Sequence, residues 1–494
     1  MDWIVTLTPE VSEDPLAALA APPAGAAVVE VRADLLPGLD LRAAVRACPL
    51  PVLVTLRSRA EGGRGPDDPA DREPVLTAAR DAGAALVDLE HHRDGHLMNR
   101  LGLAPEQVVL SWHDPEGTPA DLDDIAAELH AGPTRLVKVV PTARSLADLE
   151  RVLALHGRFN HRRPSRRRLV AFAMGPVGLP SRYLAPLLGP PISFAAWREG
   201  AGAAPGQLGI DRLEAAMGHL QGPPQRLYGV VGRDASHSLS PELHGAAYRA
   251  LGLPYLFVPV SVPDEAELAE VFAPRGATCF DRVGLPAFGW AVTTPYKFRA
   301  AQAATIVAPR VRRAGAANTL VLRDAGIAAD NTDADGIVGS LTSLGVDPVG
   351  RPAVVQGTGG AARGAAVGLY LAGAEVFLRG RDGGRTRAAA DELELGALEP
   401  GALPDEPAIL VNATPLGMRG GDASPFEAGE VEGALAVVDM VYGPGETALM
   451  ALARGAGLPA ADGLTVLAQQ GFAQHAAFTG TLPPKSAMLE VLGK

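Results

Sequence analysis

Short runs of apolar and β-branched residues alternate with alanine-rich segments through residues 1–220 of the chain. The apolar runs lie near residues 3–8, 27–32, 52–57, 85–90, 108–113, 136–140, 169–174 and 192–196. Runs at this spacing, each followed by a helical segment, predict a parallel (β/α)8 TIM barrel. Near the expected C-terminal strand ends, where this fold carries its chemistry, stand Glu30, Arg32, Arg57, Asp88, Glu90, His113, Asp114, Lys138 and Met174.

A second alternating pattern begins after the segment 221–225, which is rich in glycine and proline and is predicted to be a linker. It predicts a helix over 240–251, a strand over 255–260 and a strand that ends near Thr293. From residue 352 the order is strand, glycine turn (357–360), helix (360–372) and strand (375–378). This order is the context that a dinucleotide-binding Rossmann fingerprint requires. The expected domains are a barrel over 1–220, a substrate lobe over 226–335 and a Rossmann domain over 336–494, whose C-terminal helices return to the lobe.

Composition restricts the possible functions. A chain of 494 residues with 47% hydrophobic and 20% charged residues predicts two or three globular domains. The net charge of −12 argues against nucleic acid and anionic membranes as partners. Cys48 and Cys279 have no metal-ligand spacing, so we expect no metal and a reducing compartment. No apolar run approaches the ~20 residues that cross a bilayer, and a cytoplasmic protein is expected. The basic segment 158–168 is predicted to be a solvated loop.

Lys138 and His113 form the first candidate catalytic constellation. Lys138 interrupts the apolar run Leu136–Val140, and burial there lowers an amine pKa and favours nucleophilic attack on a ketone. His113 can serve as acid and base near neutral pH, and Glu90 is expected to orient it. A lysine reaching the solvent at the rim and a purely structural histidine are the alternatives.

Arginines and two loops complete this first constellation. Arg32, Arg57 and Arg182 supply the positive charge that an acidic protein needs to hold a carboxylate. The loop 57–63 and the stretch 199–207 are expected to close over a ligand.

Lys297 and Asp333 form the second candidate constellation. Each follows an expected strand, and a lysine and a carboxylate that meet over a hydroxyl can move its proton while hydride leaves or arrives. Taken alone, each is a plausible surface charge, and Asn331–Asp333 is also a plausible helix cap.

The first half resembles type I 3-dehydroquinate dehydratase over nearly all of residues 1–220. The matching motifs are Glu30–Arg32, Thr55–Arg57 with Glu61–Gly63, Asp88–Glu90, Ser111–Asp114, Val137–Val139, Met174–Gly175, Gly178–Arg182 and Ala204–Gln207. The resemblance implies that Lys138 forms a Schiff base and that His113 moves the proton. It also implies that Arg182 binds the substrate carboxylate while Glu30, Arg57 and Gln207 hold hydroxyls. Ala203 departs from the serine usual in the family, which removes one hydroxyl contact.

The second half resembles shikimate dehydrogenase over nearly all of residues 226–494. The matching motifs are His237–Pro241 with His244, Thr293–Lys297, Ala317–Leu320, Asn331–Asp333, Gly357–Ala361, Asn412–Met418, Asp439–Tyr442, Asp462–Leu464 and Gln470–Gly471. The resemblance implies catalysis by Lys297 and Asp333. It implies that substrate is bound by Ser238, Ser240, Thr293, Asn318, Asp333, Tyr442 and Gln470. It implies that the cofactor contacts Gly357, Gly359, Gly360, Ala361, Arg381, Arg385, Thr414 and Gly463.

Two departures from this second family affect packing and cofactor choice. Ala291 replaces a common asparagine, and we expect an effect on packing. Asp382 follows Arg381 where NADP-using relatives usually have threonine, and an inward carboxylate would repel a ribose 2′-phosphate. Arg381 and Arg385 still favour NADP, with NAD as the alternative.

Together the halves resemble bifunctional dehydratase–dehydrogenases of aromatic amino-acid biosynthesis. The expected reactions convert 3-dehydroquinate to 3-dehydroshikimate and then to shikimate with NADPH, using small-molecule substrates only. The alternatives are a catabolic NAD-dependent quinate/shikimate dehydrogenase, a C-terminal ligand sensor without catalysis, and a class I aldolase barrel. The sequence leaves the oligomeric state open.

Overall fold

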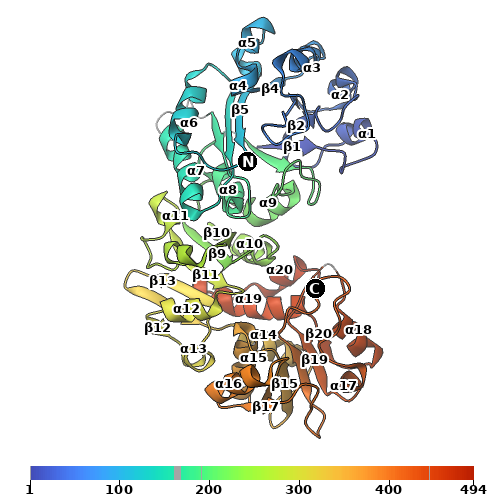
Figure 1. Cartoon of the computed structure of the whole chain (residues 1–494), viewed down its shortest axis with the longest axis vertical. Helices are drawn as coiled ribbons and strands as arrows, with labels where there is room; N and C mark the ends of the chain where they lie inside the picture. Colours follow the sequence, from blue (N-terminus) through green and yellow to red (C-terminus); the bar gives the residue numbers. More distant parts are fainter. Residues whose placement is uncertain (1, 161–167, 191, 444) are drawn as a thin grey trace.

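The computed structural model describes residues 2–160, 168–190, 192–443 and 445–494, so most of the basic segment 158–168 lies outside the described residues. Within these ranges, eight parallel strands form a nearly closed barrel in the order β7-β6-β5-β4-β3-β2-β1-β8, which confirms the predicted fold (Figure 1). The strands are β1 (Trp3–Leu7), β2 (Ala26–Arg32), β3 (Val52–Thr55), β4 (Leu86–Glu90), β5 (Val108–Asp114), β6 (Leu136–Pro141), β7 (Leu169–Ala171) and β8 (Ser193–Ala196).

Helices surround this barrel. They are α1 (Pro15–Ala20), α2 (Leu41–Ala47), α3 (Pro69–Asp81), α4 (His91–Asp94), α5 (Leu97–Arg100), α6 (Leu122–Ala131), α7 (Leu146–Phe159), α8 (Leu179–Leu184) and α9 (Ile210–Met217), with 3₁₀ turns η1 (Pro105–Gln107) and η3 (Ala185–Leu187). Several begin at side-chain caps: the carboxylates of Asp14, Asp40 and Asp68 accept hydrogen bonds from backbone N–H groups of the first turn. Such caps satisfy donors that the helix itself leaves unpaired.

Strand alternation positions the barrel chemistry. Successive side chains of a strand point to opposite faces, so every second residue faces the barrel interior. One interior cluster consists of Ile4, Val28, Leu53, Leu86, Val109, Leu136, Val140, Val170, Phe172, Ala185 and Phe194. Two positions further along their strands stand Thr6, Glu30, Thr55, Asp88, Ser111 and Lys138. The polar residues therefore form a layer directly above an apolar plug.

The second half contains two further sheets, which Figure 1 shows below the barrel. The first has the order β10-β9-β11-β13-β14-β12. Its elements are β9 (Arg226–Gly232), α10 (Ser240–Ala250), β10 (Tyr255–Ser261), η4 (Glu265–Glu270), α11 (Cys279–Arg282), β11 (Ala287–Val292), α12 (Lys297–Ala303), β12 (Ile306–Val307), α13 (Pro309–Ala314), β13 (Thr319–Arg323) and β14 (Gly326–Asp330). The helix expected over 240–251 and the strand over 255–260 are confirmed.

The last sheet is parallel and has the order β17-β16-β15-β18-β19-β20, which is the Rossmann order. Its elements are α14 (Asp333–Ser343), β15 (Pro352–Gln356), α15 (Gly360–Leu371), β16 (Glu375–Arg379), α16 (Gly383–Leu393), β17 (Gly396–Leu398), β18 (Ile409–Asn412), α17 (Ala428–Glu432), β19 (Ala436–Asp439), α18 (Ala448–Gly455), β20 (Ala460–Ala461), α19 (Gly463–Thr479) and α20 (Lys485–Glu490). Helices α19 and α20 return to contact α10 of the preceding lobe (Figure 1).

The barrel contacts the second half directly. Helix α9 packs against α10, α8 against β10, and α7 against α11. None of the helices in the described part of the chain is long and apolar enough to cross a membrane.

Candidate active sites

Lys138 lies on β6 in the interior of the barrel mouth. It is 7% exposed, and its Nζ atom stands 3.9 Å from the centroid of the Phe194 ring. Burial lowers the pKa of the Lys138 amine to about 8, against the opposing effect of the Glu30 and Asp88 carboxylates. A substantial share of neutral, nucleophilic amine is therefore present near neutral pH.

His113 stands above Lys138 on the neighbouring strand. Ser111 pairs with Lys138 in the β5–β6 register, so His113 lies two residues further toward the strand end on the same face. Its Nδ1 atom is 3.0 Å from Oε2 of Glu61, and its backbone N–H donates to the same oxygen at 3.1 Å. Burial and the cations Arg57 and Lys138 hold the pKa of His113 well below its usual value, which leaves a neutral imidazole able to accept a proton.

The prediction that Glu90 orients His113 is wrong. Glu90 is fully buried and accepts hydrogen bonds from Arg57 and from the backbone N–H of Ser58, beneath the site. Glu61 takes the orienting position instead, and burial raises its pKa to about 8. Glu61 comes from a loop, so strand alternation gave no signal for it. The sequence signal for Glu61 was its place in the motif Thr55–Arg57 with Glu61–Gly63, which matches type I 3-dehydroquinate dehydratase.

The three arginines of the first constellation differ in their partners. Arg32 forms a bidentate pair with Asp34, with both N–O distances at 2.8 Å. Arg57 contacts the carboxylates of Glu61, Asp88 and Glu90, so its charge is already balanced. Arg182 is 7% exposed and lies 4.5 Å from the Phe172 ring centroid. In the described ranges no carboxylate lies within ion-pair distance of Arg182, and burial lowers its pKa to about 10. Arg182 is therefore the arginine that suits a substrate carboxylate.

Glu30 and Gln207 are joined through Thr6. The Thr6 hydroxyl donates to Glu30 at 2.7 Å and accepts from Gln207 Nε2 at 3.0 Å. The backbone N–H of Ala203 donates to Gln207 Oε1 at 2.8 Å, so the departure at Ala203 keeps the main-chain contact that orients Gln207. Met174, three residues beyond the end of β7, is half-buried against the interior cluster.

The loop 57–63 is a packed turn and not a loose closing segment. Gly63 N–H donates to the Ser58 carbonyl at 2.7 Å, and Glu61 is 5% exposed. A Cβ atom at Gly63 would lie 2.3 Å from the Arg57 carbonyl oxygen, so only glycine fits this turn.

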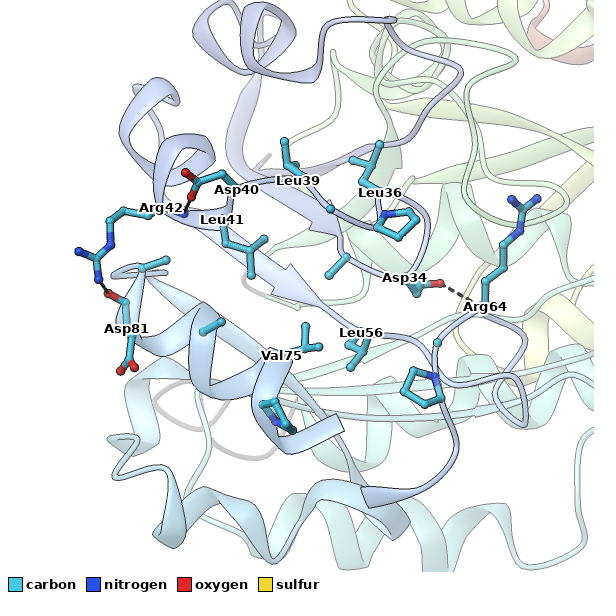
Figure 2. A pocket seen from close by; sticks show the side chains of 18 residues that line it. Asp34, Leu36, Leu39, Asp40, Leu41, Arg42, Leu56, Arg64, Val75 and Asp81 are labelled. Atoms are coloured by element: carbon cyan, nitrogen blue, oxygen red, sulfur yellow. Dashed lines mark hydrogen bonds between the residues drawn. The ribbon is translucent and has the colours of Figure 1, made fainter. Parts of the chain in front are cut away.

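A cavity of about 760 Å³ opens on the outer side of this half, between the segment 33–42 and α3 (Figure 2). Asp34 lies at its wall, where it accepts from the backbone N–H of Arg64 at 3.1 Å. The lining contains none of the predicted site residues, and this cavity is therefore separate from the candidate site at the barrel mouth.

Lys297 and Asp333 meet as predicted in the second half. Nζ of Lys297, the first residue of α12, lies 2.5 Å from Oδ2 of Asp333, the first residue of α14. Asn318 donates to the other carboxylate oxygen at 2.9 Å and to Gln470 Oε1 at 3.3 Å. Lys297, Asp333 and Asn318 are nearly buried, so an incoming hydroxyl or ketone would meet a preorganised lysine–carboxylate pair.

The predicted serines lie on one turn that leads into α10. Ser240 N–H donates to Ser238 Oγ at 3.2 Å. Burial raises the pKa of the Tyr442 hydroxyl, which Ser238 faces. Thr293 follows β11, half-buried near the start of α12. Ala291 is buried in an aromatic cluster with Tyr228 and Phe257, which supports the expected packing effect of this departure.

The glycine turn packs against Lys297. Gly357 has φ +129°, and a Cβ atom at Gly360 would lie 2.7 Å from Cβ of Lys297. Further along α15, Gly364 and Gly368 let the helix approach Asn331 and Ala334 at similarly short range. The turn is thereby seated directly beside the acid–base pair.

The arginines after β16 extend into solvent. Arg381 and Arg385 are exposed, and neither forms an ion pair within the described part of the chain. The Asp382 side chain caps α16 by accepting from Arg385 N–H at 3.0 Å. It is therefore engaged with the helix N-terminus. Among the described residues, no group of three or more His, Cys, Asp or Glu is placed to hold a metal ion.

Comparisons with known proteins find relatives for both halves of the chain. The type I 3-dehydroquinase family model matches residues 4–223, and that of the shikimate dehydrogenase substrate binding domain matches residues 230–320. A bifunctional 3-dehydroquinate dehydratase/shikimate dehydrogenase of Arabidopsis thaliana is 28% identical, over 95% of this chain and 80% of that protein.

Other relatives match the second half. A shikimate dehydrogenase (NADP(+)) of Citrifermentans bemidjiense is 37% identical, over 54% of this chain and 94% of its own length. The solved shikimate 5-dehydrogenase of Thermus thermophilus in complex with NADP(H) and shikimate is 34% identical, with a TM-score of 0.48, and covers 54% of this chain and 98% of its own. On the evidence of the Citrifermentans relative, matched over 94% of its own length, the chain belongs to the shikimate dehydrogenase family, and the family match over residues 4–223 places a type I 3-dehydroquinase unit in front of it.

Proposed function

We propose that the first half dehydrates 3-dehydroquinate to 3-dehydroshikimate and that the second half reduces this ketone to shikimate with NADPH. The observation that carries the proposal is the buried Lys138 amine, with its pKa near 8, beside a neutral histidine and Arg182, which has no carboxylate partner among the described residues. The Lys297–Asp333 pair beside the glycine turn supports the second step.

In the proposed dehydration, the neutral amine of Lys138 attacks the substrate ketone, and loss of water gives an imine. His113 removes a proton from the adjacent carbon, and the electron pair moves into the imine as an electron sink. The electrons return to expel the neighbouring hydroxyl, which His113 protonates to water. Hydrolysis of the imine then frees the product and restores the amine. Glu61 holds the imidazole through Nδ1 and the backbone N–H.

Most of the other predicted barrel residues bind substrate in this proposal. Arg182 takes the carboxylate, because a buried guanidinium without an acid partner gains most from an anion. Glu30, Arg57 and Gln207 hold ring hydroxyls, and Met174 packs on the ring. Arg32 and Glu90 act through their neighbours, because both are engaged with protein partners.

In the proposed reduction, Lys297 donates the proton to the carbonyl oxygen, while Asp333 holds the ammonium group and the resulting hydroxyl. NADPH, when bound, supplies the hydride. The turn of Ser238 and Ser240 binds the substrate carboxylate, together with Tyr442. Thr293, Asn318 and Gln470 hold the ring hydroxyls. Asn318 and Gln470 are already hydrogen-bonded to each other, which supports a shared role.

The residues of the glycine turn fit a dinucleotide. A Cβ atom at Gly359 would meet no described residue within 4 Å, which leaves space for a pyrophosphate to approach the N-terminus of α15. Gly357, Gly360 and Ala361 complete this turn. Arg381 and Arg385 are available for a ribose 2′-phosphate, and Asp382 is held by its helix, which supports NADP over NAD.

Thr414 and Gly463 border the same site. The Thr414 hydroxyl donates to Asn412 Oδ1 at 2.7 Å, at the end of β18. A Cβ atom at Gly463 would lie 2.3 Å from the Val441 carbonyl carbon, so only glycine lets α19 begin here. We assign both to the nicotinamide end of the cofactor site.

The organisation of the chain also stays a proposal: barrel 1–220, substrate lobe 226–335 and Rossmann domain 336–494. A cytoplasmic location stays a prediction, and the name of the Arabidopsis relative places that protein in the chloroplast. We propose small molecules, and neither nucleic acid nor membrane, as partners.

The test is to supply 3-dehydroquinate and NADPH to the full chain and to follow shikimate formation together with cofactor oxidation. Lys138→Ala is expected to abolish dehydration and to leave oxidation of added shikimate near wild type. Absence of shikimate formation by the wild-type chain would refute the proposal. Arg381→Ala is expected to raise the KM for NADP and not that for NAD.

A further inference from the structure

Arg212 lies on α9, at the contact between the barrel and the second half. Its guanidinium donates from Nη1 to Glu199 Oε1 at 3.2 Å, from Nη2 to the Ser238 carbonyl at 3.2 Å, and from Nε to Glu242. The side chain is 14% exposed. One guanidinium thus contacts both halves of the chain.

The contact between these helices is close. A Cβ atom at Gly245 of α10 would lie 3.0 Å from Cα of Ala216, which is four residues after Arg212 and so on the same face of α9. Glu242 lies three residues before Gly245, on the matching face of α10. Because backbone meets backbone here, the Arg212 bridge (its contacts to Glu199, Ser238 and Glu242) has little room to shift.

On the dehydrogenase side, the Arg212 bridge ends on the serine turn. Holding the Ser238 carbonyl fixes this turn, in which Ser238 Oγ accepts from Ser240 N–H. Glu242 is 9% exposed, and in the described ranges Arg212 is its only ion-pair partner. Loss of the guanidinium would leave this carboxylate buried and unpaired, two residues from Ser240.

On the dehydratase side, the Arg212 bridge ends at the base of the segment 199–209. Glu199 accepts from Arg212 with one oxygen and from Gly209 N–H with the other, at 2.9 Å. This segment carries Gln207, which donates to Thr6 in the barrel mouth. Because Glu199 joins the two ends of this segment, it fixes the position from which Gln207 reaches the first site.

We propose that Arg212 is a positioning residue for both substrate sites. From the barrel, it seats the serine turn that binds the substrate carboxylate in the dehydrogenase half, and it anchors the segment that brings Gln207 into the dehydratase half. It contacts neither substrate. A planar guanidinium can reach acceptors in these different directions, whereas a lysine ammonium cannot span them. The inference rests on the proposed function, because it needs Ser238 and Ser240 to bind substrate.

The test compares Arg212→Gln with Arg249→Gln in the full chain. Arg249 is a matched control: it crosses the same α9–α10 contact, but it donates to the backbone carbonyls of Glu214 and Ala215 and touches no substrate segment. We expect Arg212→Gln to raise the KM for shikimate about tenfold, as loss of a charge-assisted hydrogen bond does, with kcat changed less than about threefold. Arg249→Gln should leave both constants near wild type.

Two further variants separate the ends of the bridge. Glu199→Ala should raise the KM for 3-dehydroquinate and leave that for shikimate unchanged. Arg212→Lys should recover the thermal stability of the wild type but not its KM for shikimate, and it replaces Arg212→Gln in the comparison should the latter not fold.

Equal KM values for shikimate in the Arg212 and Arg249 variants would overturn the inference. So would a loss of stability in Arg212→Gln without a change in KM, because this is what a purely structural bridge predicts. A wild-type chain that does not oxidise shikimate refutes the proposed function and this inference with it. Wild-type oxidation with equal KM values refutes this inference alone.

Discussion

The ε-amino group of Lys138 should titrate far below an ordinary lysine. Burial lowers its pKa from 10.5 to about 8. At pH 7 this leaves about one amine in ten neutral, against roughly three in ten thousand at the unshifted pKa, a gain of about 300-fold. The shift costs the folded protein about 3 kcal/mol at neutral pH, because the charged form is disfavoured in the barrel.

The assay is competitive labelling with a small amine-selective reagent across a range of pH, read by peptide mass spectrometry. The chain contains only four lysines, Lys138, Lys297, Lys485 and Lys494, so each labelled peptide can be assigned. Exposed Lys485 serves as the internal reference for reagent reactivity. Labelling of Lys138 should reach half its maximum near pH 8, in the absence of any substrate.

Glu30→Gln tests the electrostatic part of this reasoning. The Glu30 carboxylate opposes the effect of burial by stabilising the ammonium form. Its neutralisation should therefore move the labelling midpoint of Lys138 to lower pH. A labelling midpoint near pH 10.5 in the wild type, or a midpoint at higher pH in Glu30→Gln, would refute the argument that burial lowers the pKa of the Lys138 amine.

Three further outcomes are expected. Glu61→Gln should slow dehydration roughly a hundredfold, because the imidazole loses its orienting partner, while borohydride still traps the imine; unchanged dehydration would contradict this role. Gly360→Ala places a Cβ atom 2.7 Å from Cβ of Lys297, the proposed proton donor of the second half, so shikimate oxidation should fall while dehydration persists. Burial lowers the pKa values of His244 and His475 from 6.5 to about 3 and about 4. Below pH 6.5 the unfolded chain binds more protons than the folded chain, so this stability is fully present above pH 6.5 and is lost as the pH falls. The free energy of unfolding, measured with urea above pH 6.5 and at pH 5, should be lower at pH 5 by about 2 kcal/mol per histidine.

The strand pattern was enough to locate Lys138 and Lys297 near strand ends, and the family resemblances supplied the roles expected of them. Lys138 interrupts an apolar strand, and Lys297 follows one, so the strand ends could be located without coordinates. The Rossmann turn at Gly357 could also be predicted from the sequence, because its strand, glycines and helix are adjacent in the chain. These features depend on interactions within about thirty residues, which is why the sequence predicts them.

Other features depended on how distant segments meet. The partner of His113 is Glu61, 52 residues away, because a loop folds over the barrel mouth, and no strand period marks that loop. Arg57 is ion-paired, whereas Arg182 has no carboxylate within ion-pair distance among the described residues. This difference depends on which carboxylates lie nearby in space. No sequence motif marks Arg212, because its contacts to Ser238 and Glu242 exist only where α9 and α10 pack together.

The amino-acid sequence thus determined which strands, turns and chemical groups this protein has, because those follow from local backbone preference and the two-residue period of a strand. Only the tertiary structure decided which carboxylate holds the His113 imidazole, which arginine stays available for an anion, and how the two halves share the Arg212 guanidinium. These outcomes depend on distances of a few ångströms between residues far apart in the chain, over which electrostatic and hydrogen-bond energies change steeply.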